Sequence, residues 1–334
     1  MSFRFEMSKA LHLLSFMLHC MGGKAPLHRI CALLYLADLK HLAQYGSPVL
    51  GDSYISTKTA IIPLNILGIY KQLKGEGSAG NQGFSFAEYF TIDMDMEIRS
   101  LNHYNESEIA PSEALCIFET VRENKQVSNE TLAASTRDHA WEHANGNGEV
   151  SYDEIAVASG VSPEFRKYIL DSCKNELRAF PGRNETGRNG KGRRENGMGT
   201  TRLLPQLQPG SLLLHKDEGG DRDCLFVAAG VSSGRYALVS VYDPGKLPAS
   251  VRQHDFLKDF FSPVSAGAHK ETKALADCSR LVSRHFRDIH SWLKKHPECY
   301  MGNLSSSETD KILRTIGRMP AIPASIKKEF NFPV

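Results

Sequence analysis

The stretch Leu33–Tyr54, LLYLADLKHLAQYGSPVLGDSY, begins as a helix and then becomes a rigid corner. Apolar residues recur at helical spacing from Leu27 to Ala37 and cover much of the helix circumference, which is typical of a helix at the centre of a core. Asp38 stands directly after these residues, on the same helix. A Tyr-Gly-Ser-Pro turn follows, and the chain continues in an extended run. The stretch predicts a buried helix that leads into a tight corner.

The acid on this helix requires a partner inside the protein. A buried carboxylate costs several kcal/mol unless it is paired or hydrogen-bonded. We therefore expect Asp38 to hold the corner in place, through backbone N–H groups or through Lys58. In that interpretation, the exposed side of the corner becomes a candidate binding surface.

Composition indicates an ordinary globular protein with room for two domains. The chain has 334 residues, 41% of them hydrophobic and 23% charged, and its net charge of +2 favours no class of partner. Its seven cysteines lie scattered without a Cys-x-x-Cys pair, which argues against a disulfide framework or a zinc finger. No apolar run approaches the ~20 residues that span a bilayer, and the N-terminal segment lacks the apolar core of a signal peptide. We therefore expect a cytoplasmic protein without a membrane segment.

A basic, glycine-rich segment divides the chain. Between Lys174 and Arg202, eight Lys or Arg stand against three Glu, and six glycines interrupt the segment. It has no apolar periodicity, so it cannot bury a face and is typical of a solvated linker. The predicted organisation is a domain at 1–175, a linker at 176–204 and a domain at 205–334.

The fold class that we predict is α+β, with a mainly helical first domain. Its apolar residues recur at helical spacing, and Ser, Pro and Gly mark the helix ends. The expected helices span residues 10–21, 27–37, 112–124, 128–136, 151–160 and 162–177, and a strand is expected at 84–92.

The second domain changes to a strand period. Strands are expected at 211–216, 224–231 and 236–243, with a further short strand at 251–256, and tight turns between such strands are typical of a small SH3-like barrel. That outline is loosely similar to the barrel of the PemK/MazF ribonuclease toxins, but their Arg-Pro before the second strand is absent, so no catalytic residue is transferred. An amphipathic helix is predicted at 272–296, with Arg280, Arg284 and Arg287 mostly on its polar side.

Several motifs of the first domain agree in order with one known family. They are Leu34-Tyr35-Leu36-Ala37-Asp38, His41, Tyr45-Gly46-Ser47-Pro48, Gly51-Asp52, Tyr54, Ser112-Glu113, Thr136-Arg137-Asp138-His139-Ala140-Trp141 and Ser151-Tyr152-Asp153-Glu154-Ile155-Ala156. Over about residues 5–172 the chain resembles the Panacea, or SocA-like, antitoxin domain, a family that is also described as phage-associated. The chain departs from the family after Tyr54, where the usual Gly-Pro is replaced by Ile62-Pro63, which affects a turn that can influence partner choice.

The resemblance implies a binding protein rather than an enzyme. Its members neutralise diverse toxins by direct contact, and an adaptor role that hands a toxin to a Clp-type protease belongs to the family's repertoire. We expect a cognate toxin as partner, in a bacterial or prophage setting that includes phage defence, and no cofactor. The residues expected to contact the partner are Tyr45, Ser47, Asp52, Tyr54 and Lys58. Those expected to act as structural anchors are Tyr35, Asp38, Trp141 and Tyr152.

Two alternatives stay open beside this interpretation. The first is a toxin or ribonuclease-like effector in the C-terminal half, held in check by the first domain. The second is a zinc hydrolase, because His139-Ala140-Trp141-Glu142-His143 spells His-x-x-Glu-His, with two histidines on one helical face and Glu142 as general base. The sequence offers no third ligand at a recognisable spacing, so we predict no metal site.

Nucleic acid is a further candidate partner. Basic side chains attract phosphate backbones, and the candidates here are Arg193, Arg194, Arg280, Arg284 and Arg287. The basic linker lacks the interleaved aromatic residues that would stack on bases. A solvated charged surface is therefore the default interpretation of these residues.

Overall fold

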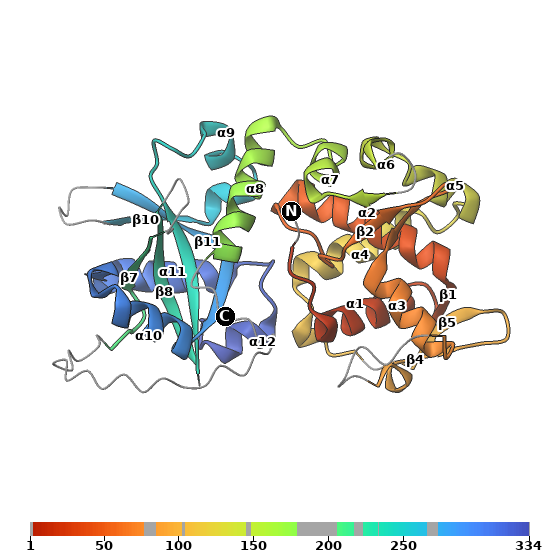
Figure 1. Ribbon diagram of the computed structural model, residues 1–334, viewed down its shortest axis with the longest axis horizontal. Helices are drawn as coiled ribbons and strands as arrows, with labels where there is room; N and C mark the ends of the chain where they lie inside the picture. Colours follow the sequence, from red (N-terminus) through yellow and green to blue (C-terminus); the bar gives the residue numbers. More distant parts are fainter. Residues whose placement is uncertain are drawn as a thin grey trace, which may run out of the picture. The chain divides into compact units, whose positions relative to one another are not determined.

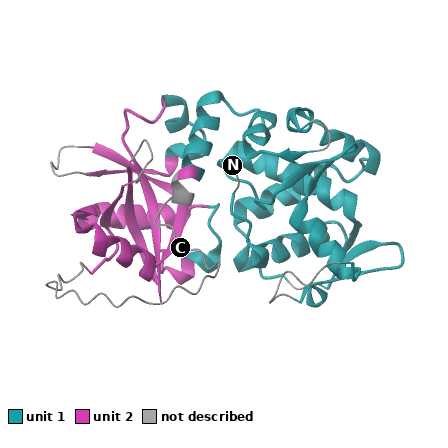
Figure 2. Cartoon of the chain, in the orientation of Figure 1, with its two compact units in different colours: residues 1–173, 249–258, 320–326 teal, residues 174–248, 259–319, 327–334 magenta. Residues whose placement is uncertain are grey.

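The computed structural model describes residues 3–76, 85–101, 104–144, 148–178, 206–216, 223–232, 234–265 and 273–333 (Figure 1). It divides into two compact units (Figure 2). Unit 1 comprises residues 1–173, 249–258 and 320–326, and unit 2 comprises residues 174–248, 259–319 and 327–334. The C-terminal half of the sequence therefore contributes two segments to unit 1. Most of the predicted linker at 176–204, including Arg193 and Arg194, lies outside the described residues.

Unit 1 is built around the helix that the opening stretch predicts. This helix, α2 (Leu27–Tyr45), buries ten of its residues and contacts α3, α4, α5 and α7. The preceding α1 (Met7–Cys20) ends before Gly22 and Gly23, which both adopt the left-handed backbone that favours glycine (φ 91° and 98°). Helix α2 ends in the same way, at Gly46 (φ 71°). Glycine thus sets both helix boundaries, and the prediction of a central apolar helix is confirmed.

Unit 1 contains further helices, some of them only in part. They are α3 (Leu64–Leu73), α4 (Pro111–Glu123), α5 (Asn129–Ser135), α6 (His139–His143), α7 (Tyr152–Ala158), α8 (Pro163–Arg178) and α9 (Ala249–Arg252), with α8 running past the boundary of unit 1 and α12 (Ala324–Glu329) beginning in it. The helices predicted at 112–124, 128–136, 151–160 and 162–177 are confirmed. Serine side chains cap three of them, because Ser128, Ser151 and Ser162 each accept a hydrogen bond from a backbone N–H of the first turn.

Two small antiparallel sheets complete unit 1. The first has the order β1-β5-β4, with β1 at Lys24–Pro26, β5 at Glu97–Ser100 and β4 at Phe90–Ile92. The second has the order β3-β2-β6, with β3 at Ile61–Pro63, β2 at Tyr54–Ser56 and β6 at Glu149–Val150. Short 3-10 turns lie at Phe86–Glu88 and Glu106–Glu108. The strand predicted at 84–92 is confirmed only at its end, because Phe86 belongs to one of these turns.

Unit 2 contains a six-stranded antiparallel sheet of order β10-β11-β9-β8-β7-β12 (Figure 1). Its strands are β7 (Ser211–His215), β8 (Cys224–Ser232), β9 (Arg235–Tyr242), β10 (Phe261–Ser265), β11 (Lys273–His285) and β12 (Tyr300–Asn303). Helix α10 (Phe286–Lys295) packs against β11, and α11 (Ser306–Arg318) packs against β8, β10 and β11. Across the described part of the chain, β10 and β12 have one strand neighbour each, so the α+β class is confirmed but a closed SH3-like barrel is not.

The prediction of one long helix at 272–296 is wrong. Residues 273–285 form β11, which pairs with β10 on one side and β9 on the other, and only Phe286–Lys295 is helical. Leu275, Cys278 and Val282 fit the spacing of a helix, but Ala276 and Cys278 are both buried and lie two positions apart, as on one face of a strand. Hydrogen bonds to a neighbouring strand on each side favour the strand. The short strand expected at 251–256 is wrong as well, because that segment begins in helix α9.

This correction separates the three arginines that the sequence places on one helix. Arg280 and Arg284 lie on β11, whereas Arg287 lies on α10, where it is exposed and its Nε is 3.7 Å from the Asp288 carboxylate. Their predicted common face on a helix does not exist. Among the helices of the described ranges, none is long and apolar enough to cross a membrane.

The end of the chain packs into unit 2 beside two glycines. A Cβ atom on Gly230, in β8, would lie 2.8 Å from Cβ of Phe330 and 3.0 Å from the ring of Phe332. A Cβ atom on Gly317, in α11, would overlap the carbonyl of Pro333. Both glycines therefore make room for the last turn of chain.

Candidate functional site

The Asp38 carboxylate lies at the centre of a buried polar cluster in unit 1. It is completely buried, and its Oδ1 accepts a 2.8 Å hydrogen bond from the Leu50 N–H. Its Oδ2 accepts one from the Tyr54 hydroxyl at 2.8 Å and lies 3.3 Å from the Tyr152 hydroxyl. Burial raises the pKa of Asp38 to about 6, although these hydrogen bonds favour the charged form. Backbone and tyrosine donors, rather than the exposed Lys58, thus satisfy the acid.

A second buried acid holds the start of α3. The carboxylate of Asp52 accepts hydrogen bonds from the backbone N–H of Asn65 at 3.0 Å and of Ile66 at 3.2 Å. It also accepts one from the Asn65 side chain at 2.7 Å. These are N–H groups of the first turn, which have no partner within the helix. The Tyr152 hydroxyl lies 3.0 Å from the Asp52 carbonyl and so connects this cap to Asp38.

Helix α6 is tied both to α2 and to the loop between β2 and β3. The Tyr35 hydroxyl on α2 donates a 2.8 Å hydrogen bond to Oδ2 of Asp138. Oδ1 of Asp138 caps α6, because it accepts from the N–H groups of Ala140 and Trp141 at 2.9 and 3.3 Å. The Trp141 indole N–H donates to the Thr57 carbonyl at 2.7 Å. The loop at Thr57 is therefore anchored to a helix that is far away in sequence.

The five residues expected to contact a partner do not share one exposed surface. Lys58 is exposed, and Tyr45 and Ser47 are half-buried. Asp52 and Tyr54 are completely buried, and their polar atoms are engaged inside unit 1. The expectation that Asp52 and Tyr54 face a partner therefore needs correction, because neither side chain reaches solvent.

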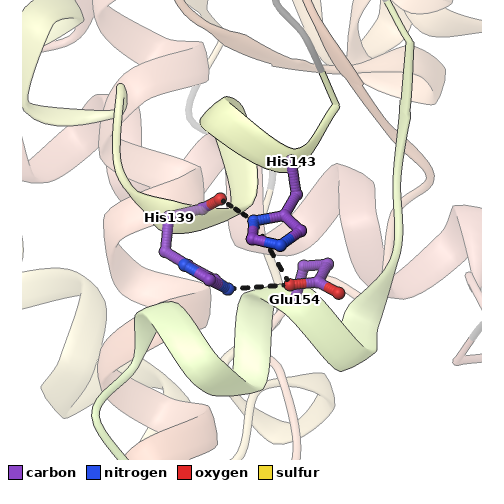
Figure 3. Close-up of side chains that lie close together, drawn as sticks. All are labelled: His139, His143 and Glu154. Carbon is purple, nitrogen blue, oxygen red and sulfur yellow. Dashed lines mark hydrogen bonds and ion pairs between the residues drawn. The ribbon is translucent and has the colours of Figure 1, made fainter.

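Three further side chains meet where α6 faces α7 (Figure 3). His139 Nε2 lies 2.9 Å from Oε2 of Glu154, and His143 Nδ1 lies 3.9 Å from the same oxygen. One potential ligand atom from each of the three residues lies within 4.8 Å of the others. The sequence shows the His139 and His143 pair but not Glu154, because the acid is eleven positions beyond His143 and only the packing of α7 on α6 brings it near.

A second group of acids, Asp93, Asp95 and Glu97, also lies close together, at the turn between β4 and β5. Lys24 occupies the centre of this group, with its Nζ 2.9 Å from Asp93 and 2.7 Å from Glu97. The ammonium group and the Arg99 guanidinium, which lies 3.6 Å from Asp93, offset two of the three negative charges, so this cluster is a structural ion-pair network around β1.

Unit 2 carries a hollow of about 920 Å³ along the outer face of α11. Its lining includes three exposed cations, Lys311, Arg314 and Arg318, and none of them forms an ion pair with another described residue. Exposed cations without an acidic partner attract anionic surfaces. No pattern in the sequence singles out these residues, since no helix was expected at Ser306–Arg318.

Residues 32–142 match the family model described as antitoxin SocA-like, Panacea domain. The match begins within α2 and ends within α6, so it contains Asp38, the corner after α2 and the Trp141 anchor. It confirms the predicted resemblance for this part of the chain, and the C-terminal half has no family match. Neither a curated protein nor a solved structure matches the chain.

Proposed function

We propose that this chain is an antitoxin-like protein that binds a cognate toxin directly and thereby neutralises it. The observation that carries the proposal is the match of residues 32–142 to the SocA-like antitoxin domain. The matched segment contains the corner after α2 together with Asp38 and Tyr54, two of the buried groups that hold it. The setting that we propose is a bacterial toxin–antitoxin pair in the cytoplasm, of prophage origin or with a role in phage defence.

The geometry of the corner supports a binding role. His41 donates from Nδ1 to the Ser47 carbonyl at 2.5 Å, and its Nε2 lies 2.9 Å from the Ser112 hydroxyl. Gly46 and Gly51 adopt left-handed backbone (φ 71° and 67°) on either side of the turn. A surface held by buried contacts loses little conformational entropy when a partner binds. We therefore propose a contact surface made of Tyr45, Ser47 and Lys58, which are the expected contact residues that reach solvent.

Within this proposal the C-terminal half contributes to the choice of partner and is not a separable effector. Its residues 249–258 and 320–326 belong to unit 1. Within that unit, the Phe256 ring packs 4.5 Å from the Tyr45 ring, and the Pro320 carbonyl accepts a hydrogen bond from the Ser112 N–H at 3.1 Å. The N-terminal half alone would lack these contacts. An adaptor role, in which the bound toxin passes to a Clp-type protease, would use the same complex.

The test is growth rescue with the gene that neighbours this one. We expect its product to arrest growth when expressed alone, and co-expression of the full chain to restore growth. The two proteins should also co-purify, and isothermal titration should give a one-to-one complex or a symmetric multiple of it. A neighbouring product that is harmless, or that stays toxic although the chain is present and folded, would contradict the proposal.

A further inference from the structure

We propose that His139, His143 and Glu154 form a binding site for a divalent transition-metal ion, with Zn²⁺ as the best fit. Figure 3 shows both imidazole rings turned towards the Glu154 carboxylate. The three potential ligand atoms lie within 4.8 Å of one another, and the two nitrogen–oxygen distances quoted above are 2.9 and 3.9 Å. Ligands about 2.0–2.1 Å from a tetrahedral zinc ion are about 3.3 Å apart. The observed separations lie on both sides of that value.

The ligands lie on elements whose ends are fixed by other contacts. The two histidines are four positions apart on α6, which Asp138 caps. Glu154 lies in the first turn of α7, and its N–H donates to the Ser151 hydroxyl at 3.3 Å. Helices whose ends are capped hold their side chains more precisely than free loops do. Only side-chain rotation is then needed to bring the three groups onto one ion.

The donor set indicates the class of metal. Two imidazoles and one carboxylate suit zinc and its transition-metal neighbours, whereas calcium and magnesium prefer oxygen ligands alone. Nδ1 of His143 also lies 3.2 Å from the His139 carbonyl. Binding of the ion through Nδ1 uses the tautomer that carries its hydrogen on Nε2.

The site is open to solvent on one side. The side chains of His139, His143 and Glu154 are 39%, 55% and 27% exposed. An ion held by three protein ligands at the surface keeps at least one position for water or for a ligand from another molecule. A simple ion pair would account for the contact of His139 with Glu154, but not for the second imidazole, whose ring centroid lies 4.1 Å from that of His139 at an interplanar angle of 44°. The bound ion would cross-link α6 to α7.

The test measures metal binding by the purified full-length chain after treatment with a chelator. Titration with zinc chloride should show one ion bound per chain, and cobalt chloride should give the visible absorption of a four- or five-coordinate ion. His143→Ala and Glu154→Gln should each weaken zinc binding by more than the ~10-fold loss that is typical for outer-shell changes. His28→Ala, which removes an exposed histidine on α2, should leave the affinity unchanged.

Circular dichroism establishes that each variant is folded. Glu154→Gln keeps the size of the side chain and so remains informative if His143→Ala does not fold. Absence of zinc binding by the wild-type chain would overturn the proposal. So would equal zinc affinity in the folded wild type and the folded Glu154→Gln variant. The readout is independent of toxin neutralisation, so failure here would leave the proposed antitoxin function unaffected.

Discussion

The Tyr54 hydroxyl donates a 2.8 Å hydrogen bond to Oδ2 of Asp38, and both side chains are completely buried. The contact joins the middle of α2 to the first residue of β2, on the far side of the corner. Because the Leu50 N–H donates to the other oxygen, a single carboxylate holds both the turn and the strand that follows. The acid within the apolar helix thus explains why the corner is rigid.

Replacement of Asp38 by Asn should change how stability depends on pH. Burial raises the pKa of Asp38 from its usual 3.8 to about 6, so the native state holds the proton more tightly than the unfolded state does. The contribution of this group is therefore fully present below 3.8 and is lost as the pH rises to about 6. Within that window the stability of the wild type should fall, relative to Asp38→Asn, by up to ~1.4 kcal/mol per pH unit.

Urea denaturation at several pH values across this window measures the difference. Because Asn does not titrate, the difference in free energy of unfolding between the wild type and Asp38→Asn should change with pH only inside this window and stay constant above it. Two curves that run parallel from the acid end to neutral pH would show that Asp38 keeps an ordinary pKa in the folded protein.

Loss of the Tyr54 hydroxyl should destabilise unit 1 without changing its shape. Tyr54→Phe leaves a buried carboxylate oxygen with one donor fewer, which typically costs ~1–3 kcal/mol. Tyr70→Phe provides a matched control, since Tyr70 is half-buried on α3 and its hydroxyl makes no hydrogen bond to a described residue. Chemical denaturation should show a lower free energy of unfolding for Tyr54→Phe than for Tyr70→Phe. Equal stability of the two variants would show that the hydrogen bond to Asp38 makes no net contribution to stability.

The exposed Lys58, in the loop between β2 and β3, should affect binding but not folding. Lys58→Ala removes an exposed cation from the loop that the Trp141 indole anchors through Thr57. We expect the affinity for the partner to fall by more than ~1 kcal/mol, as for a central contact residue, with an unchanged melting temperature. Lys71→Ala, at another exposed lysine on α3, should bind as the wild type does. Equal binding by both variants would move the contact surface away from this loop.

The sequence predicts those features that depend on neighbours in the chain. Gly22 and Gly46 end helices in the way that their position suggests, and Ser128 caps α5. Residues 273–285 show the limit of this kind of prediction. Their apolar positions fit a helix and a strand equally well, and hydrogen bonds to β9 and β10 decide between the two.

The functional groups also differ in whether they depend on neighbours in the chain or on long-range contacts. The need of Asp38 for a partner is readable from the sequence, but the partners are Leu50, Tyr54 and Tyr152, and the last of these is 114 positions away. The meeting of His143 with Glu154 likewise depends on how α6 packs against α7. Long-range contacts of this kind leave no periodic signal in a single sequence.

Any affinity of the chain for polyanions should depend on α11 more than on α10. Lys311→Ala combined with Arg314→Ala and Arg318→Ala removes the cations that line the hollow in unit 2. We expect this variant to elute from heparin at a clearly lower salt concentration, because each lost cation reduces the number of displaced counterions. Arg287→Ala provides the control, since that guanidinium already lies beside Asp288. A larger shift for the control than for the triple variant would refute this assignment.

A methyl group on Gly317 should disturb the end of the chain. The Cβ of an alanine in this buried part of α11 would overlap the carbonyl of Pro333, so either the helix or the last residues must move. Forced overpacking of this kind costs ~1–3 kcal/mol. Gly68→Ala is the matched control, because Gly68 also lies in a helix but has no atom within 4 Å of the new methyl group. That change should be neutral or stabilising by ~0.5–1 kcal/mol, since alanine favours helices more than glycine does.

Deletion of residues 331–334 from the Gly317→Ala variant identifies the cause of the loss. If the clash with Pro333 is responsible, alanine at position 317 should cost little in the shortened chain, although the shortened chain itself should be less stable because Phe332 is lost from its contact with Gly230. The comparison is a double-mutant cycle measured by chemical denaturation, in which the two changes should be strongly non-additive. Additive losses would show that the alanine acts on α11 itself and not through a clash with Pro333.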